Sequence, residues 1–97
     1  MRFVRLLIRG RVHGVGFRAF VEREANYRRL EGWVRNRRDG SVEAMIAGEA
    51  GAVDEMIEAC GRGPAVARVD AVDLEEAEAG DLARRAPGER FSVLQTA

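Results

Sequence analysis

The chain has 97 residues, a length that fits a single domain spanning residues 1–97. Its formal net charge is zero and 46% of its residues are hydrophobic, which excludes a disordered tail and a polycation that binds nucleic acid by charge alone. All 16 basic side chains are arginines, so lysine-dependent sites such as P-loops, Schiff-base sites and Ser–Lys pairs are excluded as well.

Cysteine and histidine each occur once, which limits the redox and metal chemistry open to the chain. Cys60 has no partner for an internal disulfide, and this usage is compatible with a reducing compartment. One cysteine and one histidine cannot form the cluster of a structural zinc site. The N-terminal residues alternate apolar side chains with arginines, and no segment has the length and apolarity of a bilayer span. We therefore expect a cytoplasmic protein with no membrane partner.

Apolar periodicity in the first third of the chain predicts a strand followed by a helix. Val4, Leu6 and Ile8 share one face, with arginines on the other, which is the period of a half-buried strand that ends at Gly10. After a glycine-rich stretch, apolar residues recur at helical spacing with no proline among them, so we expect a helix to begin near Phe17. These residues are Phe17, Phe20, Val21 and Ala25.

The middle of the chain predicts a hairpin and a second helix. "EGWVRN" and "SVEAMIA" are typical of two strands joined by "RRDG", in which Asp39-Gly40 supplies the positive φ angles of a tight turn. A second apolar stripe follows at helical spacing, and Gly61 to Pro64 end that helix. The stripe consists of Val53, Met56, Ile57 and Cys60. Cys60 is therefore expected to be a buried, inert thiol.

Two further strands complete the predicted fold. They are "ARVDAVDLEE" and "RFSVLQ", with "AGDLARRAPG" between them as a loop or irregular edge. The first six of these elements follow the order βαββαβ, which favours an α+β sandwich of the ferredoxin-like kind, with two helices on one face of an antiparallel sheet. Trp33 is expected to pack on this sheet. Helical carboxylates such as Glu22 and Glu58 indicate solvated helix faces.

The stretch "GRVHGVGFR", Gly10 to Arg18, is the strongest functional signal. It lies between a strand and a helix start, where backbone N–H groups can converge on an anion at the positive end of the helix. Gly14 and Gly16 permit the turns and the close approach that a Cβ would block, and Arg18 offers a planar fork of donors to phosphate oxygens. Taken alone, a tight glycine turn with an exposed arginine explains the stretch equally well, and the spacing matches no P-loop or dinucleotide fingerprint.

"GRVHGVGFR", followed after a helix by "GWVRNRRDGSVE", resembles the acylphosphatase family, and "GPAVARVDAV" is similar to that family's approach to its fourth strand. The resemblance runs from the first strand to the end of the chain. It implies a small free-standing acylphosphatase that hydrolyses the carboxyl–phosphate anhydride of acyl phosphates to carboxylate and inorganic phosphate. It also implies that the reaction needs no metal or other cofactor.

The resemblance assigns roles to individual residues. In the family the loop and the arginine after Gly-Phe bind phosphate, which carries over onto His13, Gly14, Val15, Gly16, Phe17 and Arg18. An asparagine in the "WVRN" segment positions the attacking water, which carries over onto Asn36, so Arg18 and Asn36 are the expected catalytic residues. The chain departs from the family at Arg28 and Arg29, where an apolar residue and a glycine are usual. We therefore expect a different cap at the end of the first helix.

Two alternatives stay open. Arg35, Arg37 and Arg38 form a small basic cluster, as in a non-catalytic ferredoxin-like module that binds RNA or another anion. The chain has few aromatic side chains for base stacking and lacks the usual RNP sequence, so we expect no nucleic-acid partner. The second alternative is an acylphosphatase-like domain of a larger carbamoyl-transfer protein. The short chain favours the free-standing form, which we expect to be a monomer.

Overall fold

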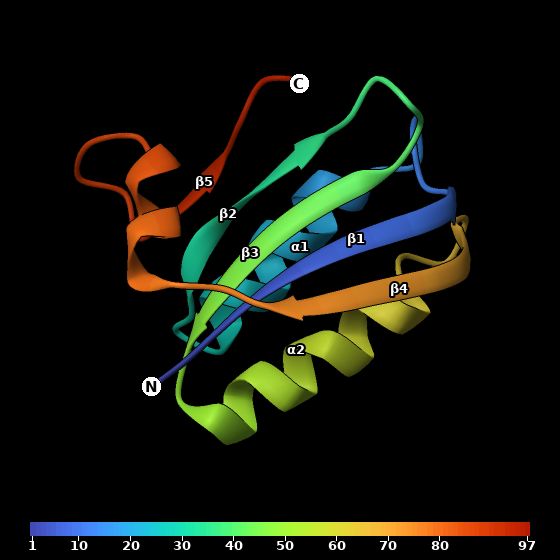
Figure 1. Ribbon diagram of the computed structural model, residues 1–97. Helices are drawn as coiled ribbons and strands as arrows, with labels where there is room; N and C mark the ends of the chain where they lie inside the picture. Colours follow the sequence, from blue (N-terminus) through green and yellow to red (C-terminus); the bar gives the residue numbers. More distant parts are fainter.

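A computed structural model of residues 1–97 contains five strands, two α-helices and one short 3₁₀ helix (Figure 1). The elements are β1 Arg2–Arg11, α1 Phe17–Tyr27, β2 Glu31–Asn36, β3 Val42–Gly48, α2 Ala50–Arg62, β4 Arg68–Glu76, η1 Ala79–Arg84 and β5 Phe91–Val93. The strands form one sheet in the order β4-β1-β3-β2-β5, and α1 and α2 lie on the same face of it (Figure 1). The prediction of a ferredoxin-like sandwich is confirmed. Neither helix has the length and apolarity required to cross a membrane.

The sheet is mixed, because its last strand runs parallel to its neighbour. β1, β3, β4 and β2 pair antiparallel, whereas β5 pairs parallel with β2 from Gly32–Phe91 to Val34–Val93. β4 and β5 lie on opposite edges of the sheet, so the chain must cross the sheet between them, and η1 lies on this crossing (Figure 1). The prediction of an antiparallel sheet is therefore corrected at this edge.

The main core fills the space between the sheet and the two helices. It contains 18 buried residues, including every member of the predicted apolar stripe on α1. Cys60 is fully buried, and this burial raises the pKa of its thiol to about 12. A thiol with so high a pKa stays protonated, which explains why it is inert, as predicted. A second, smaller cluster of Trp33, Met45 and Ala47 packs with Leu82 of η1. Trp33 Nε1 donates to the Asp81 carbonyl at 2.8 Å, which fixes the crossing segment to the sheet.

The β2–β3 hairpin differs in detail from its prediction. Arg37 N–H donates to the Ser41 carbonyl at 2.8 Å, which closes a loop of three residues, Arg38 to Gly40. Only Gly40 has a positive φ, 96°, so the expected positive φ at Asp39 is wrong. Asp39 instead accepts hydrogen bonds from the backbone N–H and the hydroxyl of Ser41, at 3.0 and 2.6 Å. The Asp39 side chain therefore stabilises the turn through these hydrogen bonds, while the Asp39 backbone keeps an ordinary conformation.

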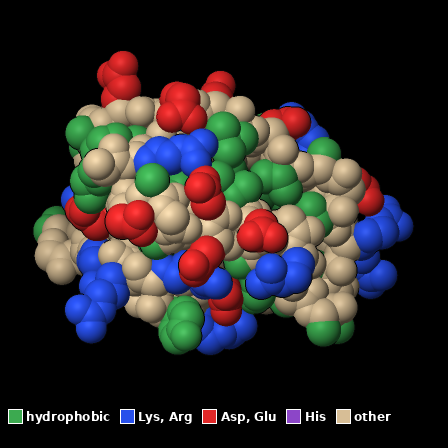
Figure 2. All heavy atoms as spheres, turned by 90° about the horizontal axis from the view of Figure 1, so that it is seen from below, with side chains coloured by type: hydrophobic (Ala, Val, Ile, Leu, Met, Phe, Trp, Pro, Cys, Tyr) green, Lys and Arg blue, Asp and Glu red, His purple; other side chains and the backbone are tan.

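The surface mixes charges of both signs. Figure 2 shows acidic and basic side chains interspersed on the face that carries α2 at the bottom of Figure 1. Edge strand β4 carries five charged residues, which discourage the addition of a strand from another chain. The exposed large hydrophobic side chains are separated along the sequence: Met1, Tyr27, Val66, Leu74 and Val93.

The end of α1 is capped at the Arg28-Arg29 departure. Leu30 N–H donates to the Ala25 carbonyl at 2.9 Å and Arg29 N–H donates to the Asn26 carbonyl at 3.1 Å, the pair of bonds that defines a Schellman cap. In such a cap the left-handed position is usually glycine, yet here it is Arg29, the one non-glycine residue with a positive φ, 56°. Arg28 Nη1 and Nε reach Glu24 and Glu55 at 3.0 and 3.2 Å, which ties this cap to α2.

Replacing Arg29 with glycine should stabilise the protein. The exposed Arg29 side chain forms no ion pair, so the substitution removes the left-handed strain and gains about 0.5–1 kcal/mol in the free energy of unfolding. Denaturant unfolding of Arg29→Gly beside Arg29→Ala measures this, because Arg29→Ala keeps the Cβ and therefore the strain. Equal stabilities of the two variants would show that the left-handed backbone is not the cause.

Candidate active site

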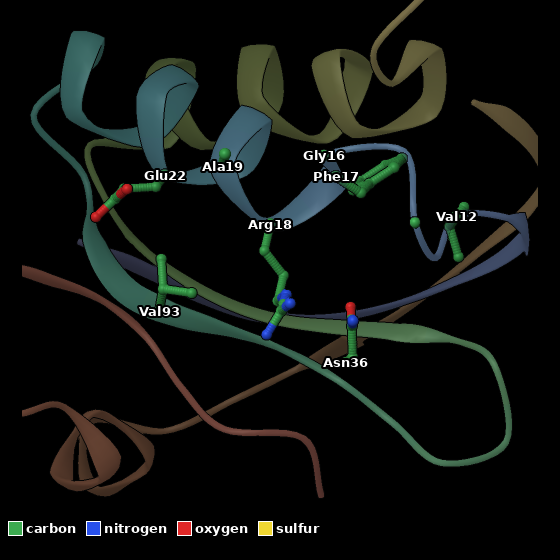
Figure 3. A pocket seen from close by; sticks show the side chains of 9 residues that line it. Val12, Gly16, Phe17, Arg18, Ala19, Glu22, Asn36 and Val93 are labelled. Atoms are coloured by element: carbon green, nitrogen blue, oxygen red, sulfur yellow. The ribbon is translucent and has the colours of Figure 1, made fainter. Parts of the chain in front are cut away.

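A pocket of about 470 Å³ opens where the Gly10–Arg18 stretch meets the sheet (Figure 3). Its volume lies within the range of about 300–1,000 Å³ that is typical of sites for whole small molecules. The lining residues come from the loop, from α1 and from the ends of β2 and β5: Val12, Gly14, Gly16, Phe17, Arg18, Ala19, Glu22, Asn36 and Val93. Four of the predicted phosphate-binding residues and the predicted water-positioning residue therefore meet at one cavity.

The pocket contains the N-terminus of α1, and no side chain caps it. The capping position is Gly16, which has no side-chain oxygen, and the helix has no acidic residue in its first turn. The first backbone bond of the helix runs from Phe20 N–H to the Gly16 carbonyl at 3.0 Å. The N–H groups of Phe17, Arg18 and Ala19 precede that bond and stand at the positive end of the helix dipole, the arrangement that binds anions.

Two glycines give the loop its path into the helix. Gly14 and Gly16 have φ angles of 71° and 77°, in the left-handed region that disfavours other residues. A Cβ at either position would meet no protein atom within 4 Å. The backbone conformation therefore requires glycine here, and the space beside both residues is open to a ligand.

Arg18 and Asn36 extend into the pocket from two different elements. Arg18 lies in the first turn of α1 and Asn36 is the last residue of β2, and in Figure 3 both side chains project into the space between these elements. Both residues are half-buried, and neither side chain forms an ion pair or a hydrogen bond within the protein. The Asn36 backbone is fixed, because its carbonyl accepts from Ala97 N–H at 3.0 Å. Both polar groups are thus available to a ligand in a well-held frame.

His13 and Val15 do not line the pocket. His13 Nε2 donates to the Ser41 carbonyl at 2.8 Å, so its ring fastens the loop to the β2–β3 hairpin. Val15 is partly buried and packs against the main core. Both side chains hold the loop in place, and a contact of either residue with phosphate would have to come from its backbone N–H.

Four of the lining residues were not predicted from the sequence. Ala19 and Glu22 follow Arg18 by one and four positions on α1, a helical spacing that could have placed Glu22 beside the site. Glu22 is half-exposed on the pocket wall, which corrects its expected place on a solvated face. Val12 lies inside the Gly10–Arg18 stretch but was not among the predicted site residues. Val93 carries no signal in the sequence, because it reaches the pocket only through the pairing of β5 with β2.

One buried carboxylate binds two of the three arginines of the predicted basic cluster beside the site. Glu43, whose side chain is only 4% exposed, accepts hydrogen bonds from Arg5, Arg35 and Arg37 at 2.6, 2.7 and 2.9 Å. Burial alone would raise the pKa of Glu43, but the three guanidinium groups outweigh it and hold the pKa below its usual value. Arg35 and Arg37 flank Asn36 in the chain, so the Glu43 carboxylate also fixes the strand end that presents Asn36.

Comparison with known proteins identifies the class to which this fold and pocket belong. The acylphosphatase family model matches residues 4–91. An acylphosphatase of Rhodopseudomonas palustris (strain BisB18) is 58% identical over 89 residues, which are 92% of this chain and 90% of that protein. One of Bradyrhizobium diazoefficiens is 55% identical over 93 residues, which are 96% of this chain and 94% of that protein. The crystal structure of acylphosphatase from Bacillus subtilis superposes with a TM-score of 0.83 at 39% identity, covering 97% of this chain and 99% of that one.

These similarities define a hydrolase of the ferredoxin-like fold that acts on small phosphorylated molecules. The chain belongs to the acylphosphatase family, and its substrates are acyl phosphates. The predicted family and activity are confirmed. The alternative of an RNA-binding module is further weakened, because Trp33 is only 2% exposed and the Arg35 guanidinium lies over its ring, 4.9 Å from the ring centroid.

Glu43→Gln should lower the free energy of unfolding at pH 7 by about 2 kcal/mol, because a buried charged acceptor is lost. The pKa of Glu43 is lower in the folded state than in the unfolded chain, so its stabilisation is complete above the unfolded value and is lost as the pH falls through the folded one. The difference between wild type and Glu43→Gln should therefore shrink below about pH 4.

Urea unfolding between pH 2.5 and pH 7 measures this difference. Glu75→Gln is the matched control, because Glu75 pairs with the same Arg5 but is exposed, and it should cost less than about 0.5 kcal/mol. A pH-independent gap between wild type and Glu43→Gln would contradict the assigned ionisation.

Proposed function

We propose that Arg18 and the backbone N–H groups of residues 13–18 hold the phosphoryl group of an acyl phosphate, and that Asn36 orients the water that attacks it. The observation that carries this proposal is the meeting of an uncapped helix N-terminus with two unpaired polar side chains in one pocket. The substrate would supply the partners that these groups lack within the protein. In this assignment Arg18 and Asn36 are the catalytic residues.

The transition state explains why a cluster of donors suits this reaction. Phosphoryl transfer to water passes through a metaphosphate-like state whose charge is spread over three peripheral oxygens. The helix amides and the planar fork of Arg18 are fixed before the substrate arrives, so they can stabilise that charge without reorganising. A lysine would provide a point charge without this two-donor geometry.

The chemistry of the leaving group limits what else the site must supply. A new bond forms between the water oxygen and phosphorus while the bond from phosphorus to the acyl oxygen breaks, and the acyl group departs as a carboxylate. A carboxylate is a stable anion, so no strong general acid is needed. The Asn36 amide can accept a hydrogen bond from the water and donate one to a phosphate oxygen. Its contribution is the orientation of the water along the line of attack.

We further propose that residues 1–97 act as one domain, as a monomer in the cytoplasm. One sheet contains all five strands and one main core serves it, which supports a single folding unit. The charged β4 edge supports the monomer. A lone buried thiol with no disulfide fits a reducing compartment.

Turnover of benzoyl, acetyl and carbamoyl phosphate by the purified protein in excess chelator tests the function. Hydrolysis of at least one of them, with competitive inhibition by inorganic phosphate, is the expected result, since phosphate is a product and fits the same donors. If the protein hydrolysed none of them, the proposed function would be wrong.

Arg18→Lys should remain severely impaired although it keeps the positive charge, with kcat/KM lowered at least about 100-fold by loss of the planar fork. Arg18→Ala should lose phosphate affinity and turnover together, because the side chain binds both ground state and transition state. Steady-state kinetics and calorimetric titration with phosphate measure the two quantities. Arg23→Lys, an exposed position on the same helix, is the control. Near-normal kcat/KM in Arg18→Lys would remove Arg18 from the mechanism.

Asn36→Ala should bind phosphate with nearly unchanged affinity while kcat falls about 100-fold or more, because the amide places the water and adds little to ground-state binding. Asn26→Ala is the matched control, since Asn26 is exposed near the far end of α1. Circular dichroism must first show that both variants are folded. A wild-type kcat for Asn36→Ala would leave Asn36 as a residue that merely ends β2.

A further inference from the structure

The pocket continues along α1 beyond the groups assigned to phosphate. Its remaining wall is formed by Ala19 and Glu22 of α1 and by Val93 of β5. In Figure 3 the Arg18 guanidinium lies between Asn36 on one side and Glu22 with Val93 on the other. The uncapped N–H groups at the start of α1 and the Arg18 side chain suffice to bind a phosphoryl group. The wall formed by Ala19, Glu22 and Val93 therefore has no role in the mechanism derived above.

The direction of the reaction determines what occupies this wall. In an in-line displacement the attacking and leaving oxygens lie on opposite sides of phosphorus. If Asn36 holds the water and the phosphoryl group binds at the Arg18 guanidinium, the leaving acyl oxygen points away from Asn36, toward the wall that Glu22 and Val93 line. We propose that Ala19, Glu22 and Val93 form the acyl subsite, and that the Glu22 carboxylate selects acyl groups without a negative charge. This inference rests on the proposed function, because it takes the position of the water from Asn36.

The chemistry of the three residues sets the class of acyl group. Val93 is 42% exposed and Ala19 is an exposed, small residue, so the wall offers apolar contact to a short acyl chain. Glu22 forms no ion pair or side-chain hydrogen bond within the protein, and the guanidinium that lines the same pocket, Arg18, is assigned to the phosphoryl group. A carboxylate at the far end of the acyl chain would therefore meet the like charge of Glu22 at the pocket wall.

Repulsion by Glu22 should produce a difference in rate between substrates and not a general loss of rate. The phosphoryl group is common to all acyl phosphates, so its own repulsion by Glu22 cancels when two substrates are compared. Butyryl phosphate and succinyl phosphate both have four-carbon acyl groups, and succinyl phosphate carries an additional terminal carboxylate. The change in the ratio of their kcat/KM values when Glu22 is replaced isolates the interaction of that carboxylate with Glu22.

Kinetics of both substrates with wild type, Glu22→Gln and Glu58→Gln test the proposal. Wild type should prefer butyryl phosphate by about three- to tenfold at low salt, the scale of one like-charge interaction across a solvated pocket. Glu22→Gln should lose most of this preference, and added salt should reduce it in wild type. Glu58 is exposed on α2, away from the pocket, so Glu58→Gln should keep the wild-type ratio.

The outcomes separate the two claims. If wild type hydrolyses both substrates and Glu22→Gln keeps the wild-type ratio, the acyl subsite is wrong while the proposed function stands. If Glu58→Gln changes the ratio as much as Glu22→Gln, the effect belongs to the overall charge and the subsite is again wrong. If wild type hydrolyses neither substrate but does hydrolyse benzoyl, acetyl or carbamoyl phosphate, the acyl subsite is wrong while the proposed function stands. If it hydrolyses none of these acyl phosphates, the proposed function fails and the acyl subsite fails with it.

Discussion

The N–H groups at the start of α1 face the pocket without a capping side chain, and the rest of the site is arranged around them. Most helices stabilise these donors with a Ser, Thr, Asp or Asn at the capping position. Here Gly16 occupies that position in a left-handed conformation, so the donors keep their capacity for an external anion. The protein forgoes the stability of a cap, and Arg18 adds a charged fork one residue into the same helix turn.

The sheet determines where the second catalytic group stands. Asn36 ends β2, and its backbone is held on one side by the chain end at Ala97 and on the other by pairing with Val42. The buried Glu43 binds the arginines on both sides of Asn36 on the face opposite the helices. The Asn36 amide therefore needs no hydrogen bond of its own to keep its backbone in place, and its polar atoms remain available to water and phosphate.

Local patterns predicted much of this fold, and long-range pairing accounts for most of what they missed. The helical spacing from Phe17 to Ala25 and the alternation in β1 follow from burial on one face, so periodicity was sufficient. The direction of β5 depends on the crossing through η1, which no local pattern records, and Val93 could not be placed without it. Glu43 lies in a fully buried strand, where charge is unexpected, and its role requires three arginines from two strands and a loop.

An NMR titration of the ¹⁵N-labelled protein with inorganic phosphate tests the central claim most directly, with chloride at equal ionic strength as the reference. The account predicts saturable shifts of the backbone amides of residues 13–18, because phosphate binds these donors, together with shifts of the Asn36 side-chain amide. Shifts confined to the Arg5 and Arg35 guanidinium groups around Glu43, or no saturable shift at the start of α1, would contradict it.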